Sequence, residues 1–281
     1  MIGPRKRALA DIPTGKHSPL DFAVTSRDQE TIKIVAAAVE HKQVLLAYQP
    51  VMQAQNNSKV AFYEGLIRVL DETGRVIPAS AFIDAIEDIE LGRKLDTLAL
   101  AQGLRALDAN TNLRLAINMS ARSIGYSPWN RTLNRWLKQN PCIGERLILE
   151  ITESSAMLVP ELVIDFMDRL QLEGICFAMD DFGAGHTALR YFKDFCFDVI
   201  KIDGQFIRGI ASDPDNQAMT AALISIAHHF DMLTVAEFVE NAADAAMLCE
   251  LGVDCLQGHH FAPATTRPYW LRQGTAMNAA V

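Results

Sequence analysis

Short apolar runs of strand length alternate along the chain with longer segments in which apolar residues recur at three- and four-residue spacing. The first pattern predicts buried strands, and the second predicts helices with one apolar face. Their alternation predicts an α/β architecture with a parallel sheet. About eight strands favour a modified TIM (β/α)8 barrel. An open doubly wound sheet is the alternative, but no GxGxxG motif follows a strand to support a dinucleotide fold.

The first two apolar runs depart from the parallel pattern. They are 44-VLLAYQPVM and 60-VAFYEGLIRV, and only the short polar segment 53-QAQNNSK joins them. Such a connection suits a hairpin, so an antiparallel first strand pair is predicted. Residues 1–29 are rich in Pro, Gly and charge and are predicted to form a flexible tail, followed by a single domain over residues 30–275.

Helices are expected between the strands. One begins at about Thr31, and others cover residues 82–107, 130–139, 160–173, 186–195, 214–230 and 241–252. Ser80 is expected to cap the helix over 82–107, with a break at Gly92 as an alternative. Pro160 and Pro214 suit the first turns of helices, and Gly252 suits a helix end.

Polar residues stand at or near the ends of six apolar runs. The runs are 60-VAFYEGLIRV, 115-LAINMS, 147-LILEITE, 177-FAMDDFG, 199-VIKIDG and 234-TVAEFVE. Burying an unpaired charge is costly, so six such segments in order indicate strand ends that converge on one polar mouth. The carboxyl ends of barrel strands meet in this way, and the mouth is predicted to bind metal.

Side-chain alternation along a strand assigns residues to this mouth. Glu64, Leu66 and Arg68 share one face of their strand, and a salt-bridged strand end is the alternative interpretation. Asn118 suits a neutral oxygen ligand; a buried amide with satisfied hydrogen bonds also fits and is the commoner case. Glu150 faces the mouth and is assigned to metal.

The next two strand ends carry acids and a lysine. Glu153 falls in the loop after its strand and is expected to hold a loop in place. Adjacent Asp180 and Asp181 repel each other unless a cation compensates; a pair of divalent metals bridged by Asp180 removes that cost. An Asp pair that caps the next helix is the weaker alternative. Lys201 shares a face with Asp203 and could polarise a metal-bound water or a phosphoryl oxygen.

The last strand ends complete the set. Glu237 is expected to be a ligand, Glu240 a more peripheral support, and Gln257 a residue that supports the ligands. Oxygen-rich ligands suggest hard cations, Mg²⁺ or Mn²⁺. The seven His lack HxxxH or HxH spacing and are assigned to surface or core.

Composition narrows the class of function. The net charge of −8 argues against a groove for long nucleic acid, although metal ions would still allow a small phosphorylated ligand. The five Cys form no CxxC pair, which indicates free thiols in a reducing compartment. No segment approaches about 20 apolar residues, so no membrane span is expected and a cytoplasmic location is predicted.

The ordered motifs resemble those of the EAL-domain cyclic-di-GMP phosphodiesterases. They are 64-EGLIR for ExLxR, 118-NMS, 150-EITE, 180-DDFGAG, 201-KID, 237-EFVE and 257-QG. The resemblance implies a modified TIM barrel and hydrolysis of 3′,5′-cyclic-di-GMP to linear pGpG with two divalent cations. It further implies a homodimer whose formation is coupled to movement of the 180-DDFGAG loop. A regulatory partner is left unidentified.

The resemblance also assigns roles to residues. One metal would be held by Glu64, Asn118, Glu150 and Asp180. The second would be held by Asp180, Asp181 and Glu237. Lys201 would orient the attacking water, and Arg68 would hold a phosphate. Gln49 and Leu66 would contact the substrate. Support would come from Glu153, Asp203, Glu240 and Gln257, with Glu153 bracing the 180-DDFGAG loop.

Three departures from the family pattern stand out. Gly65 replaces the Ala that gives the family its name; because it points away from the mouth, a small effect is expected. Phe238 stands where Gly is frequent, and either crowds the site or packs outward. The 258-GHHFAP end could alter contacts at the mouth.

Two other functions are weighed against the phosphodiesterase. A catalytically silent cyclic-di-GMP sensor would typically lack metal ligands, whereas every expected ligand type is present here. A TIM-barrel metalloenzyme with another substrate is the third hypothesis, which the ordered motifs disfavour because fold alone does not specify chemistry.

Overall fold

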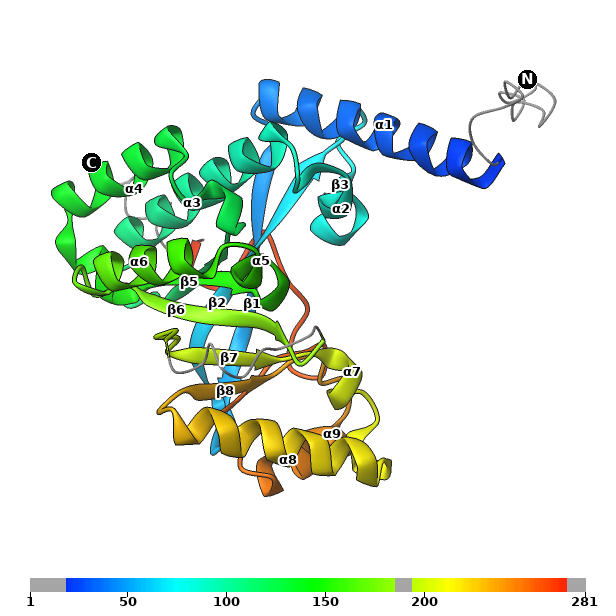
Figure 1. Cartoon of the computed structure of the whole chain (residues 1–281), viewed down its shortest axis with the longest axis vertical. Helices are drawn as coiled ribbons and strands as arrows, with labels where there is room; N and C mark the ends of the chain where they lie inside the picture. The colour runs from blue at the N-terminus through cyan, green and yellow to red at the C-terminus, as the bar shows by residue number, and fades with distance from the viewer. Residues whose placement is uncertain (1–18, 185–193, 272–281) are drawn as a thin grey trace.

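The computed structural model describes residues 19–184 and 194–271 (Figure 1). Within these ranges one sheet has the strand order β1-β9-β8-β7-β6-β5-β4-β2-β3, and pairing of β1 with β2 closes eight of its strands into a barrel. The strands are β1 (Val44–Gln53), β2 (Asn56–Leu70), β3 (Val76–Pro78), β4 (Leu115–Asn118), β5 (Leu147–Thr152), β6 (Cys176–Phe182), β7 (Val199–Ile202), β8 (Leu233–Ala236) and β9 (Cys255–Leu256).

The direction of β1 distinguishes this barrel from a fully parallel one. β1 runs antiparallel to both of its neighbours, β2 and β9. The other pairs around the ring are parallel. The predicted modified barrel with an antiparallel first strand pair is therefore confirmed, and the open doubly wound sheet is wrong because the ring closes.

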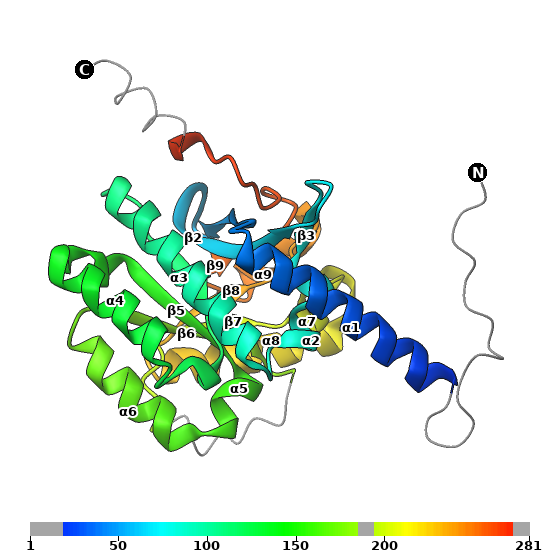
Figure 2. The same cartoon turned by 90° about the horizontal axis from the view of Figure 1, so that it is seen from above.

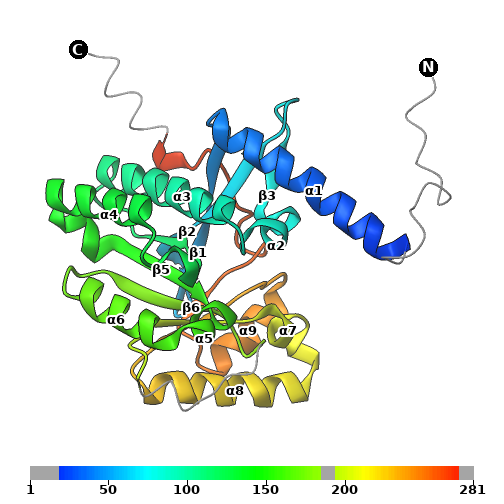
Figure 3. The same cartoon turned by 45° about the horizontal axis from the view of Figure 1, so that its top comes forward.

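Helices cover the outside of the barrel (Figures 2 and 3). α3, α4 and α6 lie on one side, and α8 lies on another with α9 near it (Figure 3). The helices are α1 (Pro19–Glu40), α2 (Ile83–Ile86), α3 (Glu90–Ala109), α4 (Ser127–Gln139), α5 (Glu153–Leu158), α6 (Pro160–Gln171), α7 (Gly204–Ile207), α8 (Pro214–His229) and α9 (Ala242–Glu250).

Several helix boundaries differ from the prediction. The first helix begins at Pro19 rather than near Thr31, so part of the expected tail is helical. Its later residues Val35 and Ala38 pack against β2 and α2. The division into a tail of residues 1–29 and a domain of residues 30–275 stays a prediction. The helix expected over 186–195 falls almost entirely outside the described residues.

The prediction for the helix over 82–107 was wrong in two details. Ser80 lies inside a short 3₁₀ turn that follows the extended Pro78, so it does not cap α2. The break falls between α2 and α3, ahead of Gly92. A Cβ on Gly92 would lie 2.7 Å from the carbonyl oxygen of Ile86, so this glycine allows the two helices to approach closely. Pro160 and Pro214 do begin helices, as expected.

An apolar layer fills the inside of the barrel. Its core consists of one buried residue from each of the eight ring strands. These are Val51, Phe62, Ala116, Ile148, Ala178, Val199, Val235 and Cys255. A larger cluster lies between the outside of the strands and the helices. The inner layer, here named the apolar floor, lies directly beneath the polar residues of the barrel.

Candidate metal centre and cavity

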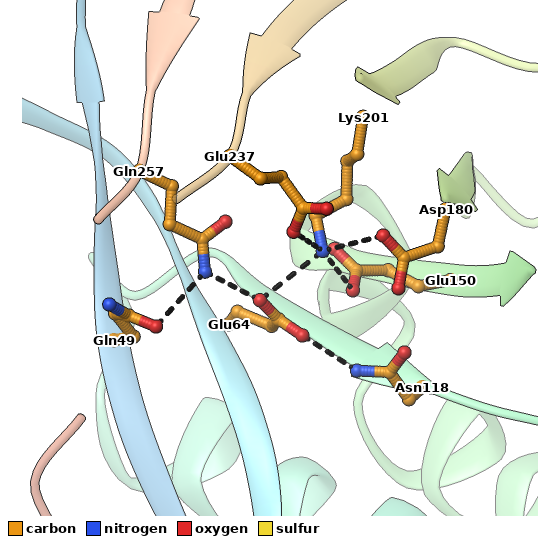
Figure 4. Close-up of polar contacts among 8 residues, drawn as sticks. All are labelled: Gln49, Glu64, Asn118, Glu150, Asp180, Lys201, Glu237 and Gln257. Carbon is orange, nitrogen blue, oxygen red and sulfur yellow. Dashed lines mark hydrogen bonds and ion pairs between the residues drawn. The ribbon is translucent and has the colours of Figure 1, made fainter. Parts of the chain in front are cut away.

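The polar residues of the site follow from the two-residue repeat of the strands. On seven ring strands, the residue two positions after the apolar-floor residue is polar; on antiparallel β1 it is the residue two positions before. Because alternate residues share a face, this second layer lies directly above the floor. Its members, here named the polar layer, are Gln49, Glu64, Asn118, Glu150, Asp180, Lys201, Glu237 and Gln257 (Figure 4).

Lys201 lies at the centre of the polar layer and contacts four of its carboxylates. Its fully buried ammonium nitrogen lies 2.9 Å from Glu237, 3.0 Å from Asp180, 3.1 Å from Glu150 and 3.3 Å from Glu64, measured to carboxylate oxygens (Figure 4). A lysine can be buried at the centre of a barrel only if anions compensate its charge. Here four strands supply one carboxylate each.

Amide side chains orient Glu64 from both sides. The Asn118 amide donates to Oε1 of Glu64 at 2.8 Å, and the Gln257 amide donates to Oε2 at 2.6 Å. The Gln257 amide also lies 3.3 Å from Oε1 of Gln49, whose own amide donates to the carbonyl of Ala262. These bonds direct the nitrogen of Asn118 toward Glu64 and leave its carbonyl oxygen available as a ligand.

A second group of carboxylates lies at the edge of the polar layer. Asp180, Asp181 and Glu237 each offer an oxygen, and these oxygens lie within 4.8 Å of one another. Asp181 adopts a φ of 56°, in the left-handed region, so it leaves the regular alternation of β6. The backbone turn therefore allows consecutive residues to contribute to one cluster, where a regular strand would point them to opposite faces.

The electrostatics of the polar layer show an excess of negative charge. Burial raises the pKa of Glu150 well above its usual value, and the charge of Glu64 adds to this effect. Burial likewise raises the pKa of Glu237, against the opposing ammonium of Lys201. Burial also acts on Glu64, but Lys201 and the amide hydrogen bonds outweigh it and its pKa is lowered. Additional positive charge would bring all of these carboxylates to their ionised form.

The donor set fits hard divalent cations. All candidate ligand atoms are carboxylate or amide oxygens, which Mg²⁺ and Mn²⁺ prefer. The buried Oε1 atoms of Glu150 and Gln257 find no hydrogen-bond partner among the described residues, although buried polar atoms are normally satisfied. Unsatisfied buried oxygens and raised carboxylate pKa values are both expected at a site where a bound cation would supply the missing partner and the missing positive charge.

The polar layer opens into a cavity of about 400 Å³. Gln49, Leu66 and Glu240 border it together with residues of the polar layer. Its other wall comes from α2 and α3, through Ile83, Leu95 and neighbouring residues. One side of the cavity is therefore charged, and the other is largely apolar.

The remaining predicted residues surround the centre. The Glu153 carboxylate is buried and accepts a hydrogen bond from the backbone N–H of Gly183, two residues after Asp181, at 3.0 Å. Asp203 caps α7 through the N–H of Gln205 and also raises the pKa of Asp181, after the larger effects of burial and of Asp180. The pKa of Asp181 reaches about 6.

Arg68 does not join Glu64 and Leu66 at the cavity. It is not among the described residues that border this space, and its guanidinium donates to the carbonyl of Ile67 at 2.9 Å. Pairing of β2 with β4 ends at Gly65, and beyond that point Arg68 lies between Leu45 of β1 and Pro78 of β3. Sharing a strand face with Glu64 was therefore not enough to place Arg68 at the cavity, because β2 continues past the barrel ring.

Two cavity residues were missed at the level of sequence. Asp96 of α3 is half-buried and accepts hydrogen bonds from the N–H of Ser120 and the hydroxyl of Ser123. Burial raises its pKa to about 6. Glu87, after α2, also borders the cavity. An acid among the apolar residues of a predicted amphipathic helix was the available signal for Asp96.

Comparison with known proteins gives the family. The family model described as "EAL domain" matches residues 32–264. The chain belongs to the EAL domain family. This EAL domain is 32% identical to the signaling protein YkoW of Bacillus subtilis, over 85% of this chain and 31% of YkoW. It is 30% identical to the cyclic di-GMP phosphodiesterase PdeA of Borreliella burgdorferi, over 88% of this chain and 37% of PdeA.

A solved structure extends the similarity to three dimensions. The EAL domain aligns with the PaMucR phosphodiesterase in complex with c-di-GMP at a TM-score of 0.73 and 27% identity, covering 84% of this chain and 97% of that one. The chain spans about a third of the length of the curated relatives it matches. None of the described helices is both long enough and apolar enough to cross a membrane.

Proposed function

We propose that this EAL domain hydrolyses 3′,5′-cyclic-di-GMP to linear pGpG with the help of two divalent cations, Mg²⁺ or Mn²⁺. The observation that carries the proposal is the polar layer itself, in which buried Lys201 contacts four carboxylates. Three of these, Glu64, Asp180 and Glu237, border a cavity of about 400 Å³. Relatives named as cyclic di-GMP phosphodiesterases support the choice of substrate.

Two sets of oxygen ligands would hold the cations. One set is Glu64, Asn118, Glu150 and Asp180. The other is Asp180, Asp181 and Glu237, whose ligand oxygens lie within 4.8 Å of one another. When bound, a cation pair supplies Lewis acidity toward the phosphate and an activated water.

Lys201 would act on the reacting groups. With cations compensating the surrounding carboxylates, its ammonium can donate hydrogen bonds to the attacking water or to a phosphoryl oxygen. Its pKa is well above the usual value because four neighbouring carboxylates outweigh the effect of burial, so it stays protonated and acts as a donor. Electrostatic stabilisation of this kind is strongest in a site that is already organised before substrate binds.

The cavity residues would position the dinucleotide. Gln49 and Leu66 border the cavity and are placed to contact substrate. Arg68 would reach a phosphate only after its guanidinium leaves the carbonyl of Ile67. Glu153 would keep the segment after Asp181 in place, with Asp203, Glu240 and Gln257 as further supports.

The wider setting is also part of the proposal. All five cysteines are free, which is compatible with a reducing, cytoplasmic compartment. A homodimer and regulation through an unidentified partner are proposed from the family resemblance alone.

The decisive experiment is hydrolysis by the purified protein. Cyclic-di-GMP is incubated with Mg²⁺ or Mn²⁺ and pGpG is followed by chromatography, with Glu64→Ala as the control. We expect product from the wild type and a loss of at least about 100-fold in the variant, because the layer loses a ligand. Absence of product together with calorimetric binding would instead favour a catalytically silent cyclic-di-GMP sensor.

A further inference from the structure

Phe238 has an unusual position for a large aromatic residue. It follows Glu237 directly, beyond the end of β8, and its φ of 52° lies in the left-handed region. Its side chain is 45% exposed and borders the same cavity as the polar layer. Strand alternation does not determine where its side chain points, because Phe238 lies beyond β8 and its φ is positive.

Two residues hold the ring of Phe238 in place. A Cβ on Gly204 would collide with the ring, so the absence of a side chain there lets the ring edge pack against the backbone that follows Asp203. The guanidinium of Arg208 lies 4.1 Å from the ring centroid, in cation–π contact. The ring is therefore fixed from the side of α7, while much of its surface remains open to solvent.

The backbone at Phe238 is unfavourable for a residue with a side chain. Only glycine adopts a positive φ without steric cost, and an aromatic residue there is a clear outlier. Burial does not offset this cost well, since nearly half of the side chain is exposed. Strained residues that border a ligand cavity are typical of functional sites, where a ligand completes the contacts.

We propose that Phe238, held by Arg208 and Gly204, is a stacking platform for one guanine base of the bound dinucleotide. This inference rests on the proposed function. Glu237 belongs to the polar layer, so a phosphodiester held there brings its attached nucleoside close to the next residue, Phe238. The flat face of the base covers the exposed ring, which is the arrangement that aromatic residues offer to single nucleotides.

The platform is tested by affinity in the intact protein. Cyclic-di-GMP is titrated calorimetrically in EDTA into the wild type, Phe238→Leu and Phe238→Tyr, and kcat and KM are measured with Mg²⁺. Loss of base stacking predicts about 5- to 100-fold weaker binding for Phe238→Leu, with KM rising in parallel and kcat little changed. Phe238→Tyr, which keeps the ring, restores most of the affinity.

A matched control separates stacking from a general loss of aromatic surface. Tyr269 is 67% exposed and does not border the cavity, so Tyr269→Leu should bind and turn over like the wild type. Wild-type affinity in Phe238→Leu, in a protein that does bind cyclic-di-GMP, would overturn the platform and leave the proposed function standing. A wild type that neither binds nor hydrolyses cyclic-di-GMP would overturn both.

Discussion

The side chain of Ile117 fills the space that a methyl group on Gly65 would need. A Cβ on Gly65 would lie 2.7 Å from Cδ1 of Ile117. Gly103 of α3 faces the same methyl, since a Cβ there would also lie 2.7 Å from it. Two glycines thus enclose one isoleucine, which explains why this EAL domain has Gly at the position of the usual Ala.

Gly65→Ala should therefore destabilise the protein, although Ala suits a strand better than Gly in general. Ile117 is enclosed by Gly103 and cannot move away freely, so we expect a loss of about 1–3 kcal/mol in the free energy of unfolding. Urea unfolding measures it. Ile117→Val removes Cδ1, the atom that a Cβ on Gly65 would meet, and alone should lower the free energy of unfolding by about 1 kcal/mol. In the double variant the two costs should not add; strict additivity would contradict the close contact.

Lys201→Met should make the stability of the protein depend on divalent cations. Four carboxylates, three of them buried, then lose their common counterion, and we expect a loss of at least about 3 kcal/mol in EDTA. Mn²⁺ binds only the folded state and should recover much of this loss. Thermal melting with and without Mn²⁺ tests the idea, with Lys94→Met, at an exposed ion pair with Glu90, as the control. An equal response to Mn²⁺ in both variants would contradict it.

Asp96 should make the protein less stable as the pH rises. Its pKa is raised by burial from 3.8 to about 6, so the folded state binds a proton more tightly than the unfolded chain. This contribution is complete below about pH 4 and is lost as the pH passes 6, a change of about 3 kcal/mol. Asp96→Asn cannot titrate and should remove it, whereas exposed Asp84→Asn should not. Unfolding in urea at several pH values, in EDTA, gives the comparison; parallel pH profiles for wild type and Asp96→Asn would refute the assignment.

Glu153→Ala should impair turnover more than folding. The backbone N–H of Gly183 then loses its acceptor, and the segment that positions Asp181 is less well held. We expect kcat to fall by about 10- to 100-fold, since small displacements of catalytic groups have large effects on rate. The lost hydrogen bond should lower stability by about 1–3 kcal/mol. Steady-state kinetics beside Glu161→Ala, an exposed acid of α6, measures the difference, and equal kcat values would show that the brace is unimportant.

The two-residue repeat explains why so much of the site was predictable from sequence. Glu64, Asn118, Glu150 and Lys201 lie on regular strands, where an apolar residue and a polar residue two positions later must share a face. Their order along the chain is the order of the strands around the ring. Local pattern was therefore sufficient to assign these residues to one mouth.

Prediction was less successful where the chain leaves the regular strand. Asp181 and Phe238 have positive φ values, so alternation does not say which way they point. Arg68 lies on a continuation of β2 that pairs with β3, a partner that sequence pattern did not identify. Ser80 and Gly92 have their positions set by the packing of α2 against α3 and against the 3₁₀ turn that precedes it. These features depend on contacts between distant segments, which local composition does not encode.

The apolar floor also limits the routes by which substrate, water and ions can reach the polar layer. One buried residue from each of the eight ring strands closes the passage beneath the polar layer. Substrate, water and ions must then use the same opening, on the side of the cavity. In the proposed reaction, linear product would have to leave by the route through which cyclic substrate enters, so accumulated product should compete directly with substrate.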